Sequence, residues 1–565
     1  PAGLGLAVKG DALRADAARL CQQLEREAAA LDHTNFEALF GGHFVAIALH
    51  RPSARAYVLR DVAGAKSVYW TRDAGVLRVG TEMHLLARLS AAPALSRDAL
   101  LHLTTLDYLF DGETFYRGIA EVPMGSLSLA TADPPGLQGL QRFDLALAEQ
   151  ENREDFATNV RALREAILQA HARRAGASNV VLLSGGIDSS VMLCALREVV
   201  DRSRLRAITF RVKGTPEDET GYAQSLAAHL GVPIERIEVD PADPRLTAQF
   251  ESDLLGMNSP YFGRFIFGQF DGRDEEVYFA GQDTRLHTPD LNGVDKLAFG
   301  LLGLQQQPAG AALGRLLAGV ASPMARCGAS TSPRRWVRGL FRAALAFDLD
   351  RYLPRFFFKL NPESLGADGY DQRMIGEALS RVKVDWRRAR SHRHLYNLIV
   401  AAKWGEQYTD DMRYLQDLAH VNGTHMALPF YDIGLARLSS ALPFDQASRF
   451  MIGRGKFGNE RQVINKVMLR EAFKTELNEA LFLRAKAVSR SQHLLFGGVM
   501  GTEVRRLLLE DRSRGAASVA QRLGVQALAE RFFATTAFRP EDEVFLTKVY
   551  WLAVLALLGR GRDVD

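Results

Sequence analysis

Short apolar runs separated by turn residues mark the first part of the chain. Residues 44–48, 56–59 and 126–129 are rich in β-favouring side chains, and Gly, Pro and Ser interrupt them. Several short strands with turn signals between them are typical of an antiparallel sheet. The pattern stops near Phe143. We therefore predict one domain, built on antiparallel strands, over residues 1–150.

A different pattern follows this domain. From Asn179 onward, short apolar strands alternate with helical stretches, as they do in βαβ units with a parallel sheet. We predict an α/β domain over residues 151–565 that is mainly helical after Asp348. Residues 305–345 depart from the alternation, because they hold Gln-Gln-Gln, scattered Gly and Pro, and a basic run. This stretch is expected to be an inserted or mobile segment.

Composition narrows the class of protein. The chain has 565 residues, of which 47% are hydrophobic and 24% charged, a balance that excludes disordered and collagen-like chains. The net charge of +4 is too small to indicate a nucleic-acid partner. Three distant cysteines indicate neither a disulfide framework nor a zinc site, so a cytoplasmic location is expected. The apolar run Val549–Leu558 is about half of the roughly 20 residues that a membrane span needs, so no span is expected.

The strongest chemical signal is a strand, a glycine-containing loop and a helix in direct succession. The apolar residues 180–183 lead into Ser-Gly-Gly-Ile-Asp-Ser-Ser, and a helical run follows. Glycines let the backbone approach a ligand, and the helix start directs free N–H groups at the loop, which makes an anion site. An ordinary strand–turn–helix corner is the competing interpretation. The predicted phosphate-binding residues are Ser184, Gly185, Gly186, Asp188, Ser189 and Ser190.

Two further strands are expected to end near this loop. Residues 206–212 and 276–280 are apolar runs within the alternating pattern. In doubly wound sheets, ligands bind at the carboxyl ends of the strands. We therefore predict that Ile208, Phe210 and Gly281 contact the same ligand as the loop. Asp188 is also a predicted Mg²⁺ ligand, because a polyphosphate brings that ion with it.

These segments resemble the synthetase domain of the asparagine synthetase B family, whose phosphate loop reads SGGxDS. The resemblance implies an α+β fold before residue 150, an Ntn-hydrolase-like β-sandwich that corresponds to the family's glutaminase domain. It implies an α/β ATP-pyrophosphatase domain with a parallel sheet and a helical C-terminal part over residues 151–565. ATP and Mg²⁺ are the implied cofactors. The segments that carry the resemblance outside the loop are residues 42–44, 60–64, 68–70, 80–82, 428–432, 466–470 and 484–486.

Two departures from the family shape the functional prediction. The glutaminase domain uses an N-terminal cysteine as its nucleophile, whereas this chain begins with Pro1 and its first cysteine is Cys21. Unless a cysteine precedes Pro1, we expect an inactive domain, as in the β-lactam synthetases and the lasso peptide macrolactam cyclases. The second departure is the sequence of residues 281–285, which replaces a GxGxDE-like segment. Asp283 is the predicted second Mg²⁺ ligand, and an aspartate at a solvated strand end is the alternative.

The resemblance also implies a reaction with two steps. A carboxylate attacks the α-phosphate of ATP to give an acyl-adenylate and pyrophosphate, and an amine then displaces AMP. Lys466 and Lys486 stand where the family has a pyrophosphate-binding and a transition-state lysine. Because an attacking ammonium must lose a proton, a general base is needed. Glu406 is the predicted base, with Asp410 and Asp411 in reserve, and solvated surface side chains are the competing interpretation.

The leading prediction is a lasso peptide cyclase, which joins the N-terminal amine of a linear core peptide to an Asp or Glu side chain. The missing cysteine, the chain length and the basic segment 305–345 favour it. The leader peptidase and the leader-binding protein of the same pathway are the expected partners. The alternatives are a β-lactam synthetase-like enzyme for a small β-amino acid, an asparagine synthetase, and a non-catalytic scaffold that binds a peptide.

Overall fold

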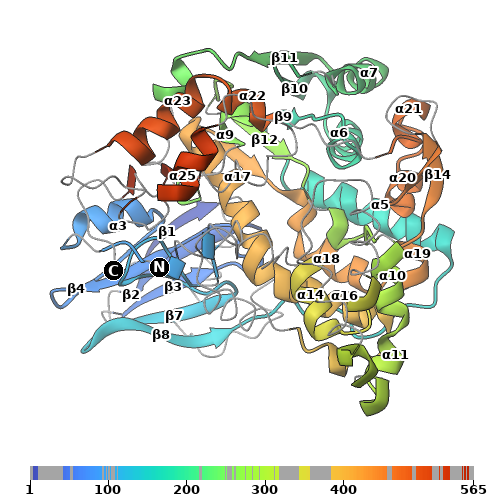
Figure 1. Cartoon of the computed structure of the whole chain (residues 1–565), viewed down its shortest axis with the longest axis horizontal. Coiled ribbons are helices and arrows are strands. Elements are labelled where there is room, and N and C mark those ends of the chain that lie inside the picture. Colours follow the sequence, from blue (N-terminus) through green and yellow to red (C-terminus); the bar gives the residue numbers. More distant parts are fainter. Residues whose placement is uncertain are drawn as a thin grey trace.

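The structure is a computed structural model in which an antiparallel part and a parallel part lie against each other (Figure 1). It describes residues 4–10, 42–50, 55–91, 94–96, 98–99, 102–103, 109–110, 112–215, 219–248, 250, 257–259, 263–273, 275–282, 284–291, 293–310, 312–316, 343–356, 384–454, 461–485, 491–511, 521, 526–534, 550, 553–554 and 557–558. Part of the predicted insertion, residues 317–342, lies outside the described residues.

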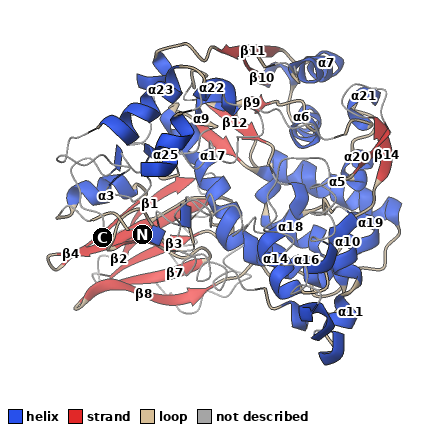
Figure 2. Cartoon of the chain, viewed as in Figure 1, coloured by secondary structure: helices blue, strands red, loops and turns tan. Residues whose placement is uncertain are grey.

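Two antiparallel sheets form the N-terminal part, shown in red at the lower left of Figure 2. The larger sheet has the order β1-β2-β3-β7-β8 and the smaller one β5-β4-β6. Their strands are β1 (Leu4–Gly10), β2 (Phe44–His50), β3 (Arg55–Arg60), β4 (Tyr69–Asp73), β5 (Val76–Gly80), β6 (Ile119–Glu121), β7 (Ser126–Ala132) and β8 (Pro135–Arg142).

A small apolar core joins the two sheets. Val45 and Val58 of the larger sheet are buried against Trp70 and Val79 of the smaller one. This packing agrees with the predicted sandwich of sheets, because side chains of facing sheets interdigitate in that architecture. The narrower assignment to the Ntn-hydrolase class stays a prediction. Residues 143–155 connect β8 to the next helix and contain the predicted domain boundary.

A five-stranded sheet organises the second part, and it is parallel, as predicted. Its order is β11-β10-β9-β12-β13, so the chain leaves β9 toward one edge and later returns to place β12 on its other side. The point between β9 and β12 is therefore the topological switch point, where such sheets bind ligands. The strands are β9 (Ser178–Leu182), β10 (Leu205–Val212), β11 (Ile234–Val239), β12 (Glu276–Ala280) and β13 (His425–Ala427).

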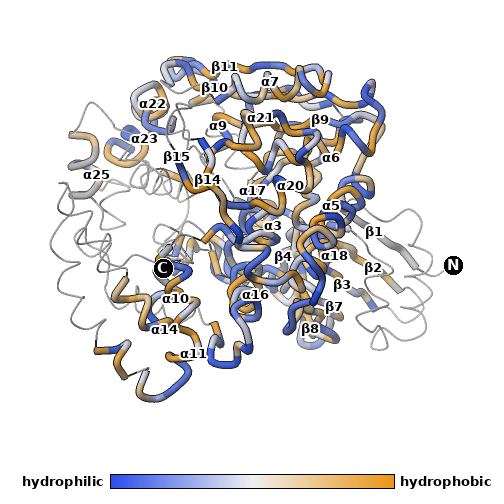
Figure 3. Tube along the Cα trace, turned by 90° about the vertical axis from the view of Figure 1, so that its right-hand side faces the viewer, coloured by the Kyte–Doolittle hydropathy of each residue, from blue (hydrophilic) through white to orange (hydrophobic). Residues whose placement is uncertain are grey.

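Helices cover both faces of this sheet and change between apolar and polar positions along their length (Figure 3). One face packs on α5 (Phe156–Ala172), α6 (Ile187–Val199), α7 (Thr220–Leu230), α18 (Ile433–Ser440) and α20 (Val467–Ala472). The other packs on α10 (Gly293–Gly300), α14 (Leu349–Phe356), α16 (His392–Lys403) and α17 (Thr409–Val421). This second core continues into the N-terminal part through Phe44 and Leu59, so the two parts share one apolar interior.

The remaining elements lie around these layers. They are α3 (Met83–Leu89), α9 (Arg264–Phe267), α11 (Leu302–Gln305), α19 (Phe444–Ala447), β14 (Met451–Arg454), β15 (Arg461–Ile464), α21 (Glu479–Phe482), α22 (Gln492–Phe496), α23 (Val499–Arg505) and α25 (Gln526–Phe533). Within the described part of the chain, no helix has the length and apolar character needed to cross a membrane.

Candidate active site

The predicted phosphate loop lies at the switch point of the parallel sheet. It connects the end of β9 at Leu182 to the start of α6 at Ile187. Gly185 has a φ of +75°, and a Cβ atom there would come within 2.7 Å of the carbonyl oxygen of Glu219. An L side chain would be strained at this φ and would also clash. The residue must therefore be glycine for the loop to keep this shape.

Serine hydroxyls fix the loop to the first turn of the helix. The amide of Ser184 donates to Oγ of Ser189 at 3.2 Å, and the two hydroxyls lie 3.1 Å apart. The Ser190 hydroxyl donates to the carbonyl oxygen of Gly186 at 2.8 Å and is buried. Ser190 thus stabilises the helix start from inside, whereas Ser184 and Ser189 line the adjacent cavity.

Asp188 forms the central contact of the site. Nζ of Lys466 lies 2.7 Å from its Oδ1 and 2.8 Å from its Oδ2. The hydroxyl of Thr284, just after β12, donates to Oδ1 at 2.6 Å. Two residues distant in the sequence thereby hold the loop carboxylate in one orientation.

The backbone of Lys466 is itself unusual. Its φ is +61°, in the left-handed region, and it caps the start of α20 while its side chain is buried. A non-glycine residue in this region costs about 1–2 kcal/mol, and such strain is concentrated at functional sites. The observed strain supports a functional role for Lys466.

Two arginines, from α20 and from the residues after α21, also belong to the site. Buried Arg470 donates to the carbonyl oxygens of Leu481, Phe482 and Arg484 at 2.6–2.9 Å, so it ties α20 to the end of α21 and to the residues that follow it. Burial lowers the pKa of Arg470 to about 10, which leaves the guanidinium charged at neutral pH. Arg484 is thereby directed back to the loop, where it donates to the carbonyl oxygen of Gly185 and pairs with Glu219 at 2.5 Å.

A cavity of about 280 Å³ opens between these elements. Three carboxylates and three cations are among its lining residues, so its charge is nearly balanced. The carboxylate of Asp290 accepts a hydrogen bond from the amide of Asn465 at 2.5 Å. The lining comprises Ser184, Gly186, Ile187, Asp188, Ser189, Glu219, Gly281, Asp290, Val463, Ile464, Asn465, Lys466, Arg470, Leu481, Arg484 and Ala485.

Gly281, predicted from the end of its strand, also lines the cavity. A Cβ atom there would lie 2.9 Å from both N and Cα of Ser189. The end of β12 can therefore approach the phosphate loop this closely only with glycine at this position. The next predicted ligand, Asp283, lies outside the described residues, as does the predicted catalytic residue Lys486.

Ile208 and Phe210 pack against a core in the structure, and their contact with the nucleotide stays a prediction. Ile208 is buried in the core that faces α10 and α16, and Phe210 packs edge-on against Phe267 with ring centroids 5.9 Å apart. Neither residue is among the described residues that line the cavity. The two side chains share one face of β10, because strand side chains alternate, and that face contacts core helices.

The predicted general base belongs to the connection between two helices. Glu406 belongs to the π-helical turn η7 (Trp404–Tyr408) between α16 and α17, and its side chain is outside the described part. Asp410, one of the reserves, accepts hydrogen bonds from Arg413 at 2.8 Å and from the Ser259 hydroxyl at 3.2 Å. These bonds hold the Asp410 carboxylate in place, and its use as a reserve base stays a prediction.

Some lining residues were not predicted from the sequence. Glu219 begins the helix after β10, and Asp290 follows a proline in an irregular stretch, so neither stands in a recognisable motif. Asn465, which precedes Lys466 in the sequence, also lines the cavity and was not predicted. The oxygen donors of Asp188, Ser184 and Ser189, which lie together at the cavity, fit Mg²⁺, an ion that prefers oxygen ligands.

Comparisons with known proteins give a coarse assignment. The family described as asparagine synthase matches residues 162–251, which include the phosphate loop. No curated protein sequence matches the chain. A solved structure of glutamine-dependent NAD⁺ synthetase from Acinetobacter baumannii in complex with ADP is 14% identical, with a TM-score of 0.15, and covers 48% of this chain. The match spans 51% of that protein. The family match supports an asparagine synthetase-like, ATP-dependent ligase that forms amide bonds.

Proposed function

We propose that the protein is an AMP-forming amide ligase that closes a macrolactam in a linear core peptide. The observation that carries the proposal is the contact of Lys466 with Asp188 on a glycine loop at the switch point of a parallel sheet. A phosphate-binding loop, a carboxylate for a cation and a buried lysine are the groups that phosphoryl chemistry on ATP requires. ATP and Mg²⁺ are the cofactors of this proposal.

In the first step, an Asp or Glu carboxylate oxygen of the peptide attacks the α-phosphorus, and the bond to pyrophosphate breaks. Backbone N–H groups of the loop and the hydroxyls of Ser184 and Ser189 would bind the leaving pyrophosphate. Mg²⁺ would neutralise phosphate charge, and Asp188 would hold it together with Asp283. With a cation held at Asp188, Lys466 would be available to pair with the phosphates instead of with that carboxylate.

In the second step, the peptide's N-terminal amine attacks the acyl carbon, AMP leaves, and the amine loses one proton. We assign that proton to Glu406 and the charge of the transition state to Lys486. Both assignments rest on the sequence.

An apolar surface beside the cavity supports a peptide substrate. Val463 of β15 lines the cavity and is 59% exposed, and Ile452 of β14 is paired with it and is 58% exposed. Directly paired residues in an antiparallel hairpin present their side chains on the same face. This face offers contact area for apolar side chains near the reacting carboxylate, which aspartate would not use. The pathway's leader peptidase and leader-binding protein would act with the enzyme as partners.

The test is incubation of the protein with ATP, Mg²⁺ and the linear core peptide. The proposal predicts a product lighter by one water whose N-terminal amine no longer reacts with an amine reagent. Intact peptide, alongside demonstrated peptide binding, would overturn it.

The volume of the cavity favours a second candidate. About 280 Å³ is slightly below the roughly 300–1,000 Å³ typical of ligand pockets, which suits a small substrate. A β-lactam synthetase-like or asparagine synthetase-like ligase would use the same loop and lysine. It predicts that a β-amino acid or aspartate, and not the peptide, stimulates the release of pyrophosphate.

A further inference from the structure

The chain passes from α16 into α17 through the π-helical turn η7. Such turns are rare and frequently occur at functional sites. They widen the helix locally and change the direction of the side chains in the turn. Glu406, the proposed base of the second step, is one of its residues. The contacts that hold this turn in place would therefore affect the step in which the amine attacks.

Trp404, the first residue of the turn, makes the first contact with the N-terminal part. Its indole N–H donates to the carbonyl oxygen of Ala63 at 2.9 Å, and the side chain is fully buried. Tyr431 packs edge-on against the indole, with ring centroids 6.0 Å apart. The beginning of the turn is thus fixed between the two parts of the molecule.

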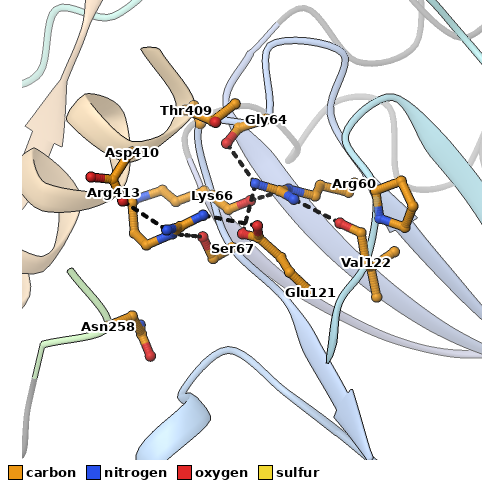
Figure 4. A network of polar contacts seen from close by, with 12 residues as sticks. Arg60, Gly64, Lys66, Ser67, Glu121, Val122, Asn258, Thr409, Asp410 and Arg413 are labelled. Carbon is orange, nitrogen blue, oxygen red and sulfur yellow. Dashed lines mark hydrogen bonds and ion pairs between the residues drawn. The ribbon is translucent and has the colours of Figure 1, made fainter. Parts of the chain in front are cut away.

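A buried charge cluster makes the second contact (Figure 4). Glu121 of β6 lies 2.9 Å from Arg60 and 2.8 Å from Arg413 of α17, and all three side chains are buried. Burial opposes ionisation of Glu121, but the two guanidinium groups outweigh it and lower its pKa below the ordinary value. The carboxylate therefore stays charged and links the domains.

Neighbouring residues add to this link. Nε of Arg413 donates to the Ser67 hydroxyl at 3.1 Å, and Lys66 donates to the side-chain amide of Gln416. Ala63, Lys66 and Ser67 belong to one short connection between β3 and β4. One loop of the N-terminal part thus contacts both η7 and the first two helical turns of α17.

The first turns of α16 contact the residue next to Thr284, which itself binds the phosphate loop. The Tyr396 hydroxyl donates to the carbonyl oxygen of Arg285 at 2.6 Å. The preceding residue, Thr284, donates to Asp188 at 2.6 Å. α16 is therefore linked to the phosphate loop through residues 284–285 near its beginning, and to the N-terminal part through Trp404 at its end.

We infer that the N-terminal part is a positioning element for the second step: its 63–67 loop holds the π-helical turn, and with it Glu406, relative to the bound acyl-adenylate. The inference rests on the proposed function and goes beyond it, since it gives a role to a domain expected to be catalytically inactive. Trp404 and Ser67 are positioning residues in this account. In the proposed mechanism no residue of the turn acts in adenylation, so only the step that consumes the amine should depend on these contacts.

Two mild variants, Trp404→Phe and Ser67→Ala, test the inference. Each removes one hydrogen-bonding group and keeps the charge cluster. Val58→Ala is the matched control, because it weakens the core between the N-terminal sheets without touching α16 or α17. Substrate-dependent exchange of pyrophosphate into ATP reports the first step, and the yield of cyclised peptide reports the second.

We expect each variant to keep its exchange rate and to lose about tenfold in cyclisation, since displacement of a catalytic group by up to 1 Å lowers rates by as much as about 100-fold. Val58→Ala should retain both rates. An equal fall in both steps, or no change in cyclisation, would overturn the inference. A wild-type protein with neither exchange nor product would instead count against the proposed function.

Hydrogen exchange tests the physical link without any substrate. Ser67→Ala should speed amide exchange in residues 404–413, with no change in residues 205–212 of β10. Unchanged exchange in 404–413 would show that the 63–67 loop does not hold the turn and would overturn the inference, whatever the activity.

Discussion

The ammonium group of Lys466 contacts both carboxylate oxygens of Asp188, at 2.7 and 2.8 Å, although the two residues are 278 positions apart. The pair joins the start of α6 to the start of α20 across the cavity. A lysine held against the loop carboxylate is placed to pair with phosphate once a cation takes over the carboxylate. The pair is therefore the structural feature on which the proposed first step depends most.

Replacement of Lys466 separates catalysis from backbone strain. Lys466→Ala and Lys466→Gly should both lower pyrophosphate exchange by about 100–1,000-fold, the usual loss for one preorganised charge-stabilising group. The glycine variant should be more stable than the alanine variant by about 1 kcal/mol, because only glycine adopts the φ of +61° without strain. Urea unfolding of the two variants measures the difference. Equal stability would contradict the strain, and retained exchange would contradict the role in catalysis.

Gly281→Ala should separate the end of β12 from the phosphate loop. The new Cβ would lie 2.9 Å from N of Ser189, and the backbone on both sides would have to shift. We expect loss of ATP binding in a folded protein, measured by calorimetry with Mg²⁺ and ATP. Gly221→Ala in α7 is the control, since nothing lies within 4 Å of a Cβ there. Normal ATP affinity in Gly281→Ala would contradict the assigned geometry.

Acid should destabilise the fold through two buried histidines. Burial lowers the pKa of His171 and of His287 from 6.5 to about 4. Unfolding restores the ordinary pKa, so the unfolded chain binds more protons between pH 6.5 and 4 and stability falls as the pH is lowered through that window. The loss for each histidine is at most about 1.4 kcal/mol per pH unit. Urea midpoints at pH 7, 6 and 5 check the slope.

His287→Gln provides the control for this dependence. The imidazole contacts the Ser439 hydroxyl and the carbonyl oxygen of Phe430, each at 2.8 Å, so the change removes a titrating group from a defined environment. The variant should be less stable at pH 7 and should show a shallower slope between pH 6.5 and 4. The depressed pKa of Asp432 affects only lower pH. An unchanged slope would show that His287 does not remain neutral in the fold.

The parts of the site that are local in sequence could be predicted from it. The strand, the glycine turn and the helix of residues 178–199 are set by neighbouring residues, so the phosphate loop was visible as a pattern. Lys466 was found because a resemblance marked its position. The parallel sheet followed from alternating strands and helices.

Contacts between distant residues could not be predicted in this way. Glu219 meets Arg484 across 265 positions, and Asp290 meets Asn465 across 175, so their place in the cavity depends on tertiary packing alone. For Ile208 and Phe210 the strand was predicted correctly, the two side chains share a face that packs on a core, and their contact with the nucleotide stays a prediction. A one-residue offset decides whether a strand side chain faces a core or a ligand.

Glu406→Gln should affect only the second step. Removal of a general base lowers rates by about 100–10,000-fold, so cyclisation should fall by that much while pyrophosphate exchange persists. Asp410→Asn, a change in a carboxylate bound to Arg413, should instead reduce stability more than it changes the ratio of the two rates. If Glu406→Gln cyclises the peptide normally, another residue takes the proton.

The most direct test of the account is the substrate-dependent release of pyrophosphate from ATP, measured side by side with a linear core peptide, a β-amino acid and aspartate. The account predicts that the peptide alone stimulates release, with one pyrophosphate for each peptide that becomes lighter by one water. Release with aspartate or the β-amino acid but not with the peptide would contradict the macrolactam proposal, and release with none of the three would contradict an AMP-forming ligase acting on these substrates.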